Sequence, residues 1–335
     1  MSGLHQSRIE WCDSTFNPIS GCLGPRGTGD ICPYCYAARQ VRRFEPKASE
    51  WPEEGTVHAA THDPRCYIAE KPTALRDADG KYLRSTPYPK GFAPTIHAYK
   101  LAFLKSAEAP RRIFIGSMAD VFGEWIPDAW IIEIFKTCRE APQHVYMFLT
   151  KNPARYFQLA RDGLLPEGDN YWYGTTTPTT ETPFFYSDKH KTFTSIEPLL
   201  GPFEPISEAV RAPDWIIVGA MTGIGAKKHR PKREWLDGIF KMCADREIPL
   251  FTKNNILDCV WGEERQEIPA AMTEHLKKIC PVDWQSLEVH KIFLERVREP
   301  KVCRQCTASV QGKPAWRLSG RYYICESCYK GGGNA

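Results

Sequence analysis

The chain has 335 residues, of which 42% are hydrophobic and 25% are charged, and its formal net charge is +4. This length is enough to bury a full core and predicts one large domain with a smaller attachment. There is no run of 18 apolar residues to span a bilayer and no apolar segment at the start, so we expect a cytoplasmic protein without a membrane partner.

Thirteen cysteines are present. An odd number without a secretion signal argues against a disulfide framework and predicts metal ligands or buried thiols. Seven of the thirteen fall in two tight clusters, one within residues 22–35 and the other within residues 303–328. The other six are scattered, and we expect them to be buried as small apolar side chains.

The first third of the chain is predicted to supply one strand–helix unit and then an insertion. A strand is expected at 8–11, followed by the first cysteine cluster and a helix at 34–44. Residues 45–95 hold seven prolines and no steady hydrophobic period. Because they also hold aromatic residues that need burial, we expect a long insertion or lid, and then a helix at 96–108.

From residue 110 onward, short β-branched or aromatic runs alternate with segments of helical period. Strands are expected at 112–116, 145–150, 171–175, 192–196, 215–219 and 249–252. Helices are expected at 127–141, 153–162 and 232–246, with a weaker one at 204–211. This alternation predicts an α/β fold with a parallel sheet, and seven strands in series favour a partial or full barrel over a doubly wound sheet.

Polar or small residues follow each of these strands. Since the carboxyl ends of parallel strands meet at one edge, we expect these residues to share a common rim. Lys151 and Lys253 are among them. They are expected to pair with Asp120 or Glu197, and the alternative is that they hold a phosphate or a carboxylate.

The second cysteine cluster has the spacing of a zinc ribbon. Two C-x2-C pairs, Cys303 with Cys306 and Cys325 with Cys328, are separated by eighteen residues. This pattern predicts four thiolates around one Zn²⁺, and the metal would stabilise a module too small to fold on its own core. Residues 301–335 carry a net charge of +5, so we expect nucleic acid as a partner, the alternative being plain solvated charge.

The first cluster offers three ligands, Cys22, Cys32 and Cys35, and no matching second pair nearby. Three thiolates around a [4Fe–4S] cluster leave one iron open to a small molecule, whereas an electron-carrying cluster normally has four cysteines. The alternative is that Cys12 completes a closed zinc or iron–sulfur site.

Three cysteines after the first strand of a βα barrel, the last two spaced as CPYC, resemble the radical S-adenosylmethionine (radical SAM) enzymes. More narrowly, residues 8–255 are similar to the phage- and bacteria-associated three-Cys-motif family, distant relatives of spore photoproduct lyase. The matching stretches are WCDSTFNPISGC, CPYCYA, IFIGSMADVF, FLTKNPARY, TSIEPLLGP, DWIIVGAMTG and PLFTKNN. The usual radical pattern is C-x3-C-x2-C, so the longer first gap here requires a bulged loop.

The resemblance implies a [4Fe–4S] cluster on Cys22, Cys32 and Cys35, with Tyr34 near the adenine of S-adenosylmethionine. It implies further cofactor contacts in three groups. The methionine part would meet Gly116, Ser117, Met118 and Asp120. The ribose would face Thr175, Thr176, Ser195 and Glu197. The adenine would meet the backbone of Gly219, Ala220 and Met221.

The function implied by the resemblance is a radical SAM enzyme that cleaves S-adenosylmethionine to a 5′-deoxyadenosyl radical and acts on a nucleic acid or nucleotide-like substrate. Such an enzyme needs an electron donor, and the family resemblance suggests a separately encoded partner protein. The alternative is a non-enzymatic iron–sulfur and zinc protein that binds nucleic acid or a partner protein. The expected organisation is a radical-SAM-type barrel over 1–262, a helical connector over 263–300 and the zinc ribbon over 301–335.

Overall fold

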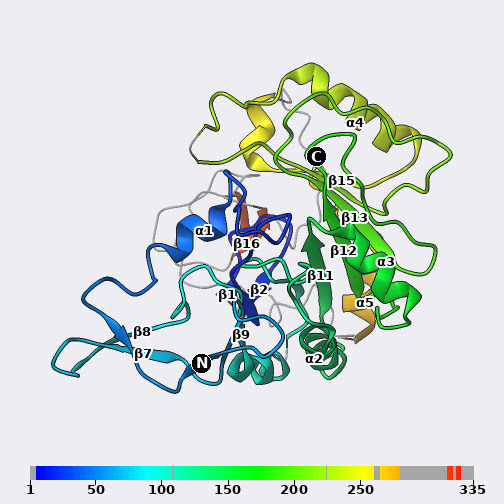
Figure 1. Ribbon diagram of the computed structural model, residues 1–335. Coiled ribbons are helices and arrows are strands. Elements are labelled where there is room, and N and C mark those ends of the chain that lie inside the picture. The colour runs from blue at the N-terminus through cyan, green and yellow to red at the C-terminus, as the bar shows by residue number, and fades with distance from the viewer. Residues whose placement is uncertain are drawn as a thin grey trace.

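The computed structural model describes residues 5–107, 109–223, 225–259, 265–279, 315–319 and 322–325. Its centre is an eight-stranded sheet in which one strand is antiparallel and seven are parallel, curled into an open half-barrel (Figure 1). In spatial order the strands are β1 (His5–Gln6), β2 (Ser14–Phe16), β10 (Arg112–Ile115), β11 (Val145–Thr150), β12 (Tyr171–Thr176), β13 (Lys191–Ile196), β14 (Ile216–Val218) and β15 (Leu250–Thr252). The predicted α/β fold with a partial barrel is therefore confirmed.

Three amphipathic helices cover the convex face of the sheet. They are α2 (Asp128–Arg139), α3 (Pro153–Arg161) and α4 (Arg233–Asp245), as predicted to within a residue or two. In α2 the buried residues Ile131, Ile134, Phe135 and Cys138 recur at helical spacing and pack on the outward side chains of β10 to β12. Burial of this apolar stripe, rather than intrinsic propensity, holds the helix in place.

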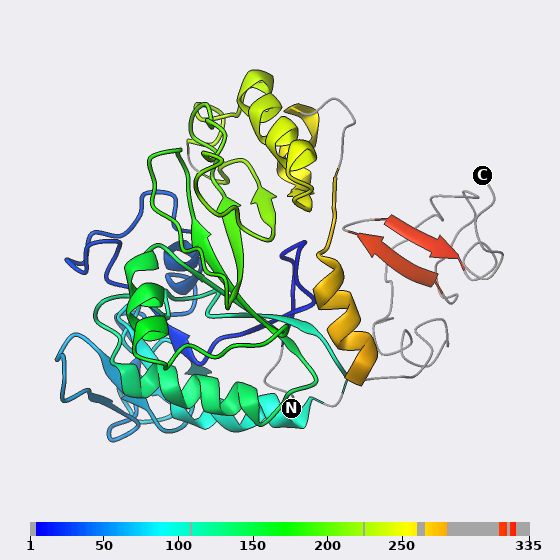
Figure 2. The same ribbon diagram turned by 90° about the vertical axis from the view of Figure 1, so that its right-hand side faces the viewer.

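The concave face is filled at its amino-terminal half by large apolar side chains. Alternate strand residues point inward, among them Met147, Trp172, Phe193 and Phe251. The helix α5 (Ala270–Ile279) closes this end with Met272, and Figure 2 shows it on the side of the sheet opposite α2 and α3. Among the described residues, the carboxyl-terminal ends of the strands are left open to the cavity.

The prediction of a first strand at 8–11 is wrong. Those residues form a turn in which Ile9 N donates to Ser7 Oγ at 2.9 Å, and β2 takes the expected place beside β10. The apolar pattern that suggests a strand arises because Trp11 packs inside the half-barrel, with its ring centroid 4.8 Å from that of Phe114.

Two further helices differ from expectation at the amino-terminal side. The helix predicted at 34–44 is shorter, α1 (Tyr36–Val41), because the chain turns at Arg42. The segment predicted as a helix at 96–108 begins as a strand, β9 (Thr95–His97), and continues as the 3-10 helix η1 (Ala98–Ser106).

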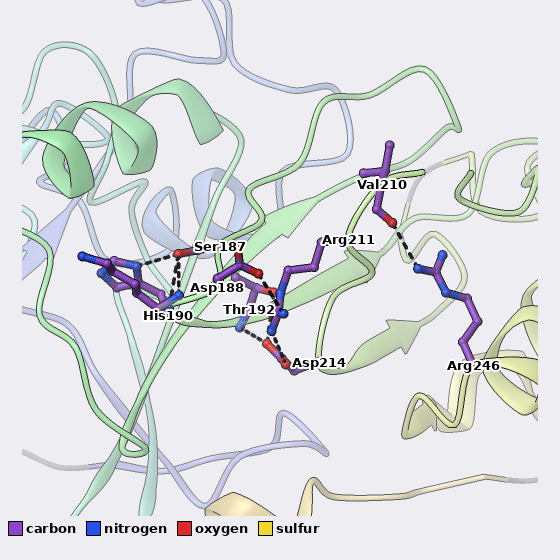
Figure 3. A network of polar contacts seen from close by, with 9 residues as sticks. Ser187, Asp188, His190, Thr192, Val210, Arg211, Asp214 and Arg246 are labelled. Carbon is purple, nitrogen blue, oxygen red and sulfur yellow. Dashed lines mark hydrogen bonds and ion pairs between the residues drawn. The ribbon is translucent and has the colours of Figure 1, made fainter. Parts of the chain in front are cut away.

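The weak helix predicted at 204–211 is irregular backbone. Its carbonyls find partners outside the segment, because Arg246, directly after α4, donates to Ile206 O at 3.2 Å and to Val210 O at 3.1 Å. Figure 3 shows this region, in which Arg211 bridges Asp188 and Asp214 and the Asp214 carboxylate accepts from the Thr192 backbone. The network joins the amino-terminal ends of β13 and β14, far along the strands from the open edge.

The insertion at 45–95 contains several short strands, for which the sequence gives no prediction. One sheet joins β4 (Trp51–Pro52), β7 (Thr73–Arg76) and β8 (Tyr82–Thr86). A second sheet joins β3 (Ile19–Ser20), β9, β6 (Tyr67–Ala69) and β5 (Val57–Ala59). Strands of two to five residues are too short to show a hydrophobic period in the sequence. The pairing of β3 with β9 connects the insertion to the start of the first cysteine cluster.

Near the carboxyl terminus, β16 (Ala315–Ser319) and β17 (Tyr322–Cys325) form an antiparallel pair, and η2 (Asn254–Cys259) follows β15. Cys303, Cys306 and Cys328 lie outside the described residues, as does most of the predicted connector after α5. Of the helices in the described segments, none combines the length and apolarity needed to cross a membrane.

Candidate functional site

A cavity of about 430 Å³ opens at the carboxyl edge of the sheet, where the sequence predicts the rim. Residues that follow β10 to β15 form one side of it, and the first cysteine cluster with the start of α1 forms the other. Its polar and charged walls include Ser117, Asp120, Thr150, Lys151, Thr176, Ser195, Glu197, Thr222 and Lys253. Its apolar floor includes Ile9, Trp11, Phe114 and Leu149. A cavity of this size holds a ligand of ordinary small-molecule dimensions.

All three cysteines of the first cluster line this cavity. Cys22 follows β3 and is fixed by backbone bonds on both sides, since Gly21 N donates to Met118 O at 2.9 Å and Cys22 N donates to Phe92 O at 3.1 Å. Cys32 and Cys35 belong to one tight turn, in which Cys35 N donates to Cys32 O at 2.9 Å.

The nine-residue gap between Cys22 and Cys32 closes on itself as a bulged loop. Gly29 N donates to Leu23 O at 2.7 Å, and Gly24 has a φ of +79°. A side chain at Gly24 would meet the Asp30 carbonyl oxygen at 2.0 Å, so only glycine fits where the loop folds back. The long spacing is thereby absorbed without moving Cys32 away from the cavity.

Backbone N–H groups point at two of the sulfurs. Gly24 N donates to Cys22 Sγ at 3.2 Å, and Ala38 N donates to Cys35 Sγ at 3.4 Å, so that Cys35 caps the amino terminus of α1. Burial raises the pKa of Cys22 to about 12, and the nearby Asp120 carboxylate adds to the rise. Burial also raises the pKa of Cys32, which the Lys151 ammonium partly offsets. Metal binding at these thiols would therefore release protons.

The start of α1 is tied to the loop after β10. The Tyr36 hydroxyl donates to the Ser117 carbonyl oxygen, and Met118 packs against Ala37 and Val41 of α1. Asn17 holds the same loop from below, because its Oδ1 accepts from Ser117 Oγ and from Met118 N, both at 3.0 Å. The cysteine cluster and the first strand-end loop are thus one connected unit.

Asp120 links the first two strand ends. Its carboxylate accepts from Thr150 Oγ1 at 2.7 Å and from Lys151 N at 2.9 Å. It is the Lys151 backbone, not its ammonium, that binds Asp120 here.

Lys253 pairs with Glu197, which is one of the two outcomes expected for it. The pair lies at the edge of the cavity, over Gly219 of the intervening strand end, where a side chain would come within 2.9 Å of Lys253 Cδ. Next to it, Asn255 binds both polar groups of the Ala220 backbone: Ala220 N donates to its Oδ1 at 3.1 Å, and its Nδ2 donates to Ala220 O at 2.8 Å.

The family profile described as "Protein of unknown function (DUF5131)" matches residues 6–277. The chain belongs to the DUF5131 family. The matched range includes the whole parallel sheet, the first cysteine cluster and nearly all of α5, whereas the second cysteine cluster lies beyond it. Searches of curated proteins and of solved structures returned no match.

In this DUF5131 chain, most of the residues that the sequence singles out for the first site meet at the cavity. They are Cys22, Cys32, Tyr34, Cys35, Gly116, Ser117, Asp120, Thr176, Ser195, Glu197, Ala220 and Met221. Three others do not line it. Met118 packs under α1, Thr175 Oγ1 accepts from Phe185 N at 3.0 Å, and Gly219 lies beneath the Lys253 side chain. Alternation along β12 explains Thr175, since neighbouring strand residues face opposite sides.

Several lining residues are not predicted by the sequence. Trp11 and Phe114 form the floor, and Tyr36 and Phe92 stand at the sides. The position of Tyr36 directly after Cys35 is a usable signal. Phe92 comes from the insertion, which sequence spacing alone cannot bring to the cysteines.

Cys12 does not join the other three cysteines. It is absent from the cavity wall, its thiol donates to Ser7 Oγ at 3.1 Å, and burial raises its pKa to about 12. In the part of the chain that the structure describes, no three or more His, Cys, Asp or Glu side chains are grouped so as to hold a metal ion.

Proposed function

We propose that this chain is a radical SAM enzyme, in which Cys22, Cys32 and Cys35 hold a [4Fe–4S] cluster and the cavity binds S-adenosylmethionine. The observation that carries the proposal is that the three thiols line the same cavity as the ends of six parallel strands. In parallel α/β sheets that edge is where ligands bind.

The donor set fits such a group. All three donors are cysteine thiols on the wall of one cavity, and cysteine thiolates are the usual ligands of iron–sulfur clusters. Two sulfurs accept backbone N–H bonds, which stabilise thiolate charge. Cys12 is engaged with Ser7, so the three ligands leave one iron for another molecule.

When bound, the cluster would supply the electron that cleaves S-adenosylmethionine to methionine and a 5′-deoxyadenosyl radical. The chain's own residues would bind and shield that cofactor. Trp11, Phe114 and Leu149 give the cofactor an apolar floor, and Asn17 orients the Ser117–Met118 backbone beside the cysteines. Because Ala220 N is taken by Asn255, an adenine contact here would fall to the neighbouring Met221 rather than to the Ala220 amide.

The proposed substrate is a nucleic acid or a nucleotide-like molecule. Support comes from the charge of +5 on residues 301–335. We also propose that the four carboxyl-terminal cysteines bind Zn²⁺. The antiparallel pair β16–β17 supports this, because a hairpin between the two C-x2-C turns is the usual frame of a zinc ribbon. An electron donor and a separately encoded partner protein remain part of the proposal.

Anaerobic reconstitution with iron and sulfide tests the site directly. Wild-type protein is expected to bind about four irons and to bind S-adenosylmethionine in calorimetry. Replacement of Cys22, Cys32 and Cys35 by serine is expected to abolish both. Cys12→Ser is the matched control and should leave the iron content unchanged.

Loss of iron in Cys12→Ser would show a closed four-cysteine site and contradict the proposal. A full iron content without any binding of S-adenosylmethionine would instead favour the non-enzymatic alternative.

A further inference from the structure

The loop between β14 and α4 is the most cationic stretch of the sheet domain. Residues 221–233 contain five lysines and arginines, Lys227, Lys228, Arg230, Lys232 and Arg233, and no aspartate or glutamate. The side chains of Lys227, Lys228 and Lys232 are exposed, and none of them has an ion pair with any residue that the structure describes. Outside this loop and residues 301–335 the chain has a net charge of −6, so the positive charge is concentrated in these two segments.

This basic loop begins at the cavity. Met221 and Thr222 are lining residues, and the next residues cross over α1. Arg39 of α1 donates through Nη2 to Thr222 O at 3.4 Å, and a side chain at Gly223 would come within 2.6 Å of Arg39 Nη1. The loop is therefore seated on α1, whose residues Tyr36 and Ala37 line the cavity.

Further basic residues follow the end of α1 at Val41. Beyond Arg39, the exposed residues Arg42, Arg43 and Lys47 follow, with Glu45 as the one carboxylate among residues 39–47. Arg39 and the basic loop, which are far apart in sequence, thus meet at the mouth of the cavity.

The interior of the cavity has no excess negative charge for the basic loop to neutralise. Its charged lining residues are two acids, Asp120 and Glu197, and two bases, Lys151 and Lys253, which balance each other. A strip of positive charge outside a neutral cavity suits a ligand that extends beyond it and carries repeated negative charge.

An aromatic ring stands at the same mouth. Tyr36 lines the cavity yet is 44% exposed, and its hydroxyl is fixed by the Ser117 carbonyl. Exposed rings beside cations are the surface on which single-stranded nucleic acids stack their bases.

We propose that the basic loop 221–233 and Arg39 of α1 bind the phosphodiester backbone of a single-stranded or locally unpaired nucleic acid, which presents one nucleotide to the cavity. A duplex is too wide for a cavity of about 430 Å³, so a nucleotide in a duplex would have to be extruded to reach it. This inference deepens the proposed function by placing substrate binding at the cavity and not at the carboxyl-terminal module alone.

The test measures binding of a fluorescein-labelled 20-nucleotide single-stranded DNA to the full chain by anisotropy, at several salt concentrations. The loop variant carries Lys227→Gln, Lys228→Gln and Lys232→Gln. A control of equal charge carries Lys105→Gln, Lys136→Gln and Lys189→Gln, which lie on η1, on α2 and before β13. Losing three phosphate contacts should lower the slope of log K against log salt by about 2 and weaken binding at 0.1 M salt by about 10- to 100-fold. The control should stay within about 2-fold.

Equal losses in both variants, or no binding by the wild type, would overturn the inference. A second measurement locates the strand: photocrosslinking of a 5-iodouracil substituted at mid-strand should label Tyr34 or Tyr36, and labelling confined to residues 301–335 would also overturn it. Neither assay needs the cluster or S-adenosylmethionine. A failure to bind DNA would therefore not contradict the proposed radical SAM chemistry. A chain that binds no iron would likewise not contradict a positive DNA-binding result.

Discussion

Lys253 and Glu197 form an ion pair across the carboxyl end of β14, with the backbone of Gly219 directly beneath it. The two charges come from strands on either side of β14, so the pair closes over a strand end that has no room for a side chain. It fixes the position of two of the four charges that line the cavity.

The first prediction concerns that glycine. Gly219→Ala places a methyl group 2.9 Å from Lys253 Cδ and 3.3 Å from Glu197 Cδ. Because neighbouring groups must shift to admit it, the free energy of unfolding should fall by about 1–3 kcal/mol in urea titrations. Gly201→Ala is the control, since nothing lies within 4 Å of its added Cβ, and it should change stability by less than about 0.5 kcal/mol. Equal effects would mean that the pair is not held over Gly219.

The second prediction concerns the bulged loop between Cys22 and Cys32. Gly24→Ala combines a positive φ with a clash against Asp30 O at 2.0 Å, so it should open the loop and lower the iron bound per chain after reconstitution. Gly29→Ala also has a positive φ but meets nothing within 4 Å. It should therefore cost stability of about 1 kcal/mol while keeping the iron content. Full iron in Gly24→Ala would show that the loop closure does not position Cys22.

The third prediction concerns Asn17, which positions the loop after β10. Asn17→Ala leaves Met118 N and Ser117 Oγ without their acceptor, and we expect binding of S-adenosylmethionine to weaken about 10-fold in calorimetry. Asn17→Asp retains an acceptor oxygen and should restore most of the affinity, with iron content unchanged in both variants. If the aspartate variant binds S-adenosylmethionine no better than the alanine variant, then Asn17 does not act by accepting the hydrogen bonds from Ser117 Oγ and Met118 N.

The fourth prediction is a dependence of stability on pH that arises from His144. Burial, together with the Arg111 charge, lowers its pKa from 6.5 to about 4. The unfolded chain then binds a proton between pH 6.5 and pH 4 that the folded chain does not. The free energy of unfolding should fall on acidification through this range, by about 2 kcal/mol at pH 5 for this residue.

Denaturant titrations at pH 7 and pH 5 check this. His144→Phe keeps an aromatic ring beside Tyr146 and should remove about that much of the difference between the two pH values. His58→Gln, on the exposed side of β5, is the control and should behave as the wild type. An unchanged difference in His144→Phe would contradict the assignment.

Sequence patterns predict the elements whose burial repeats over several residues. The strands around Met147, Trp172 and Phe193 and the helices α2 to α4 can be located because each buries an apolar run or stripe. The apolar residues around Trp11 predict a strand wrongly. Side chains that are buried from a turn leave the same apolar pattern in the sequence as side chains of a hydrogen-bonded strand. The short strands of the insertion escape prediction because two to five residues carry too little period.

The candidate site is predictable where chain order alone brings residues together. Strand ends meet at one edge of a parallel sheet, so strand order is enough to group Asp120, Ser195 and Glu197 with the cysteines. The apolar floor and the contact of Arg39 with the basic loop join segments far apart in the chain. Those contacts depend on how the half-barrel curls, which no local pattern specifies.

The most direct test of the central claim is chromatography for 5′-deoxyadenosine after anaerobic reconstitution, addition of S-adenosylmethionine and reduction with dithionite. The account predicts that wild-type protein forms 5′-deoxyadenosine and that Cys35→Ser forms none, while Cys12→Ser remains active. Protein that carries its full complement of iron and binds S-adenosylmethionine but yields no 5′-deoxyadenosine would contradict it.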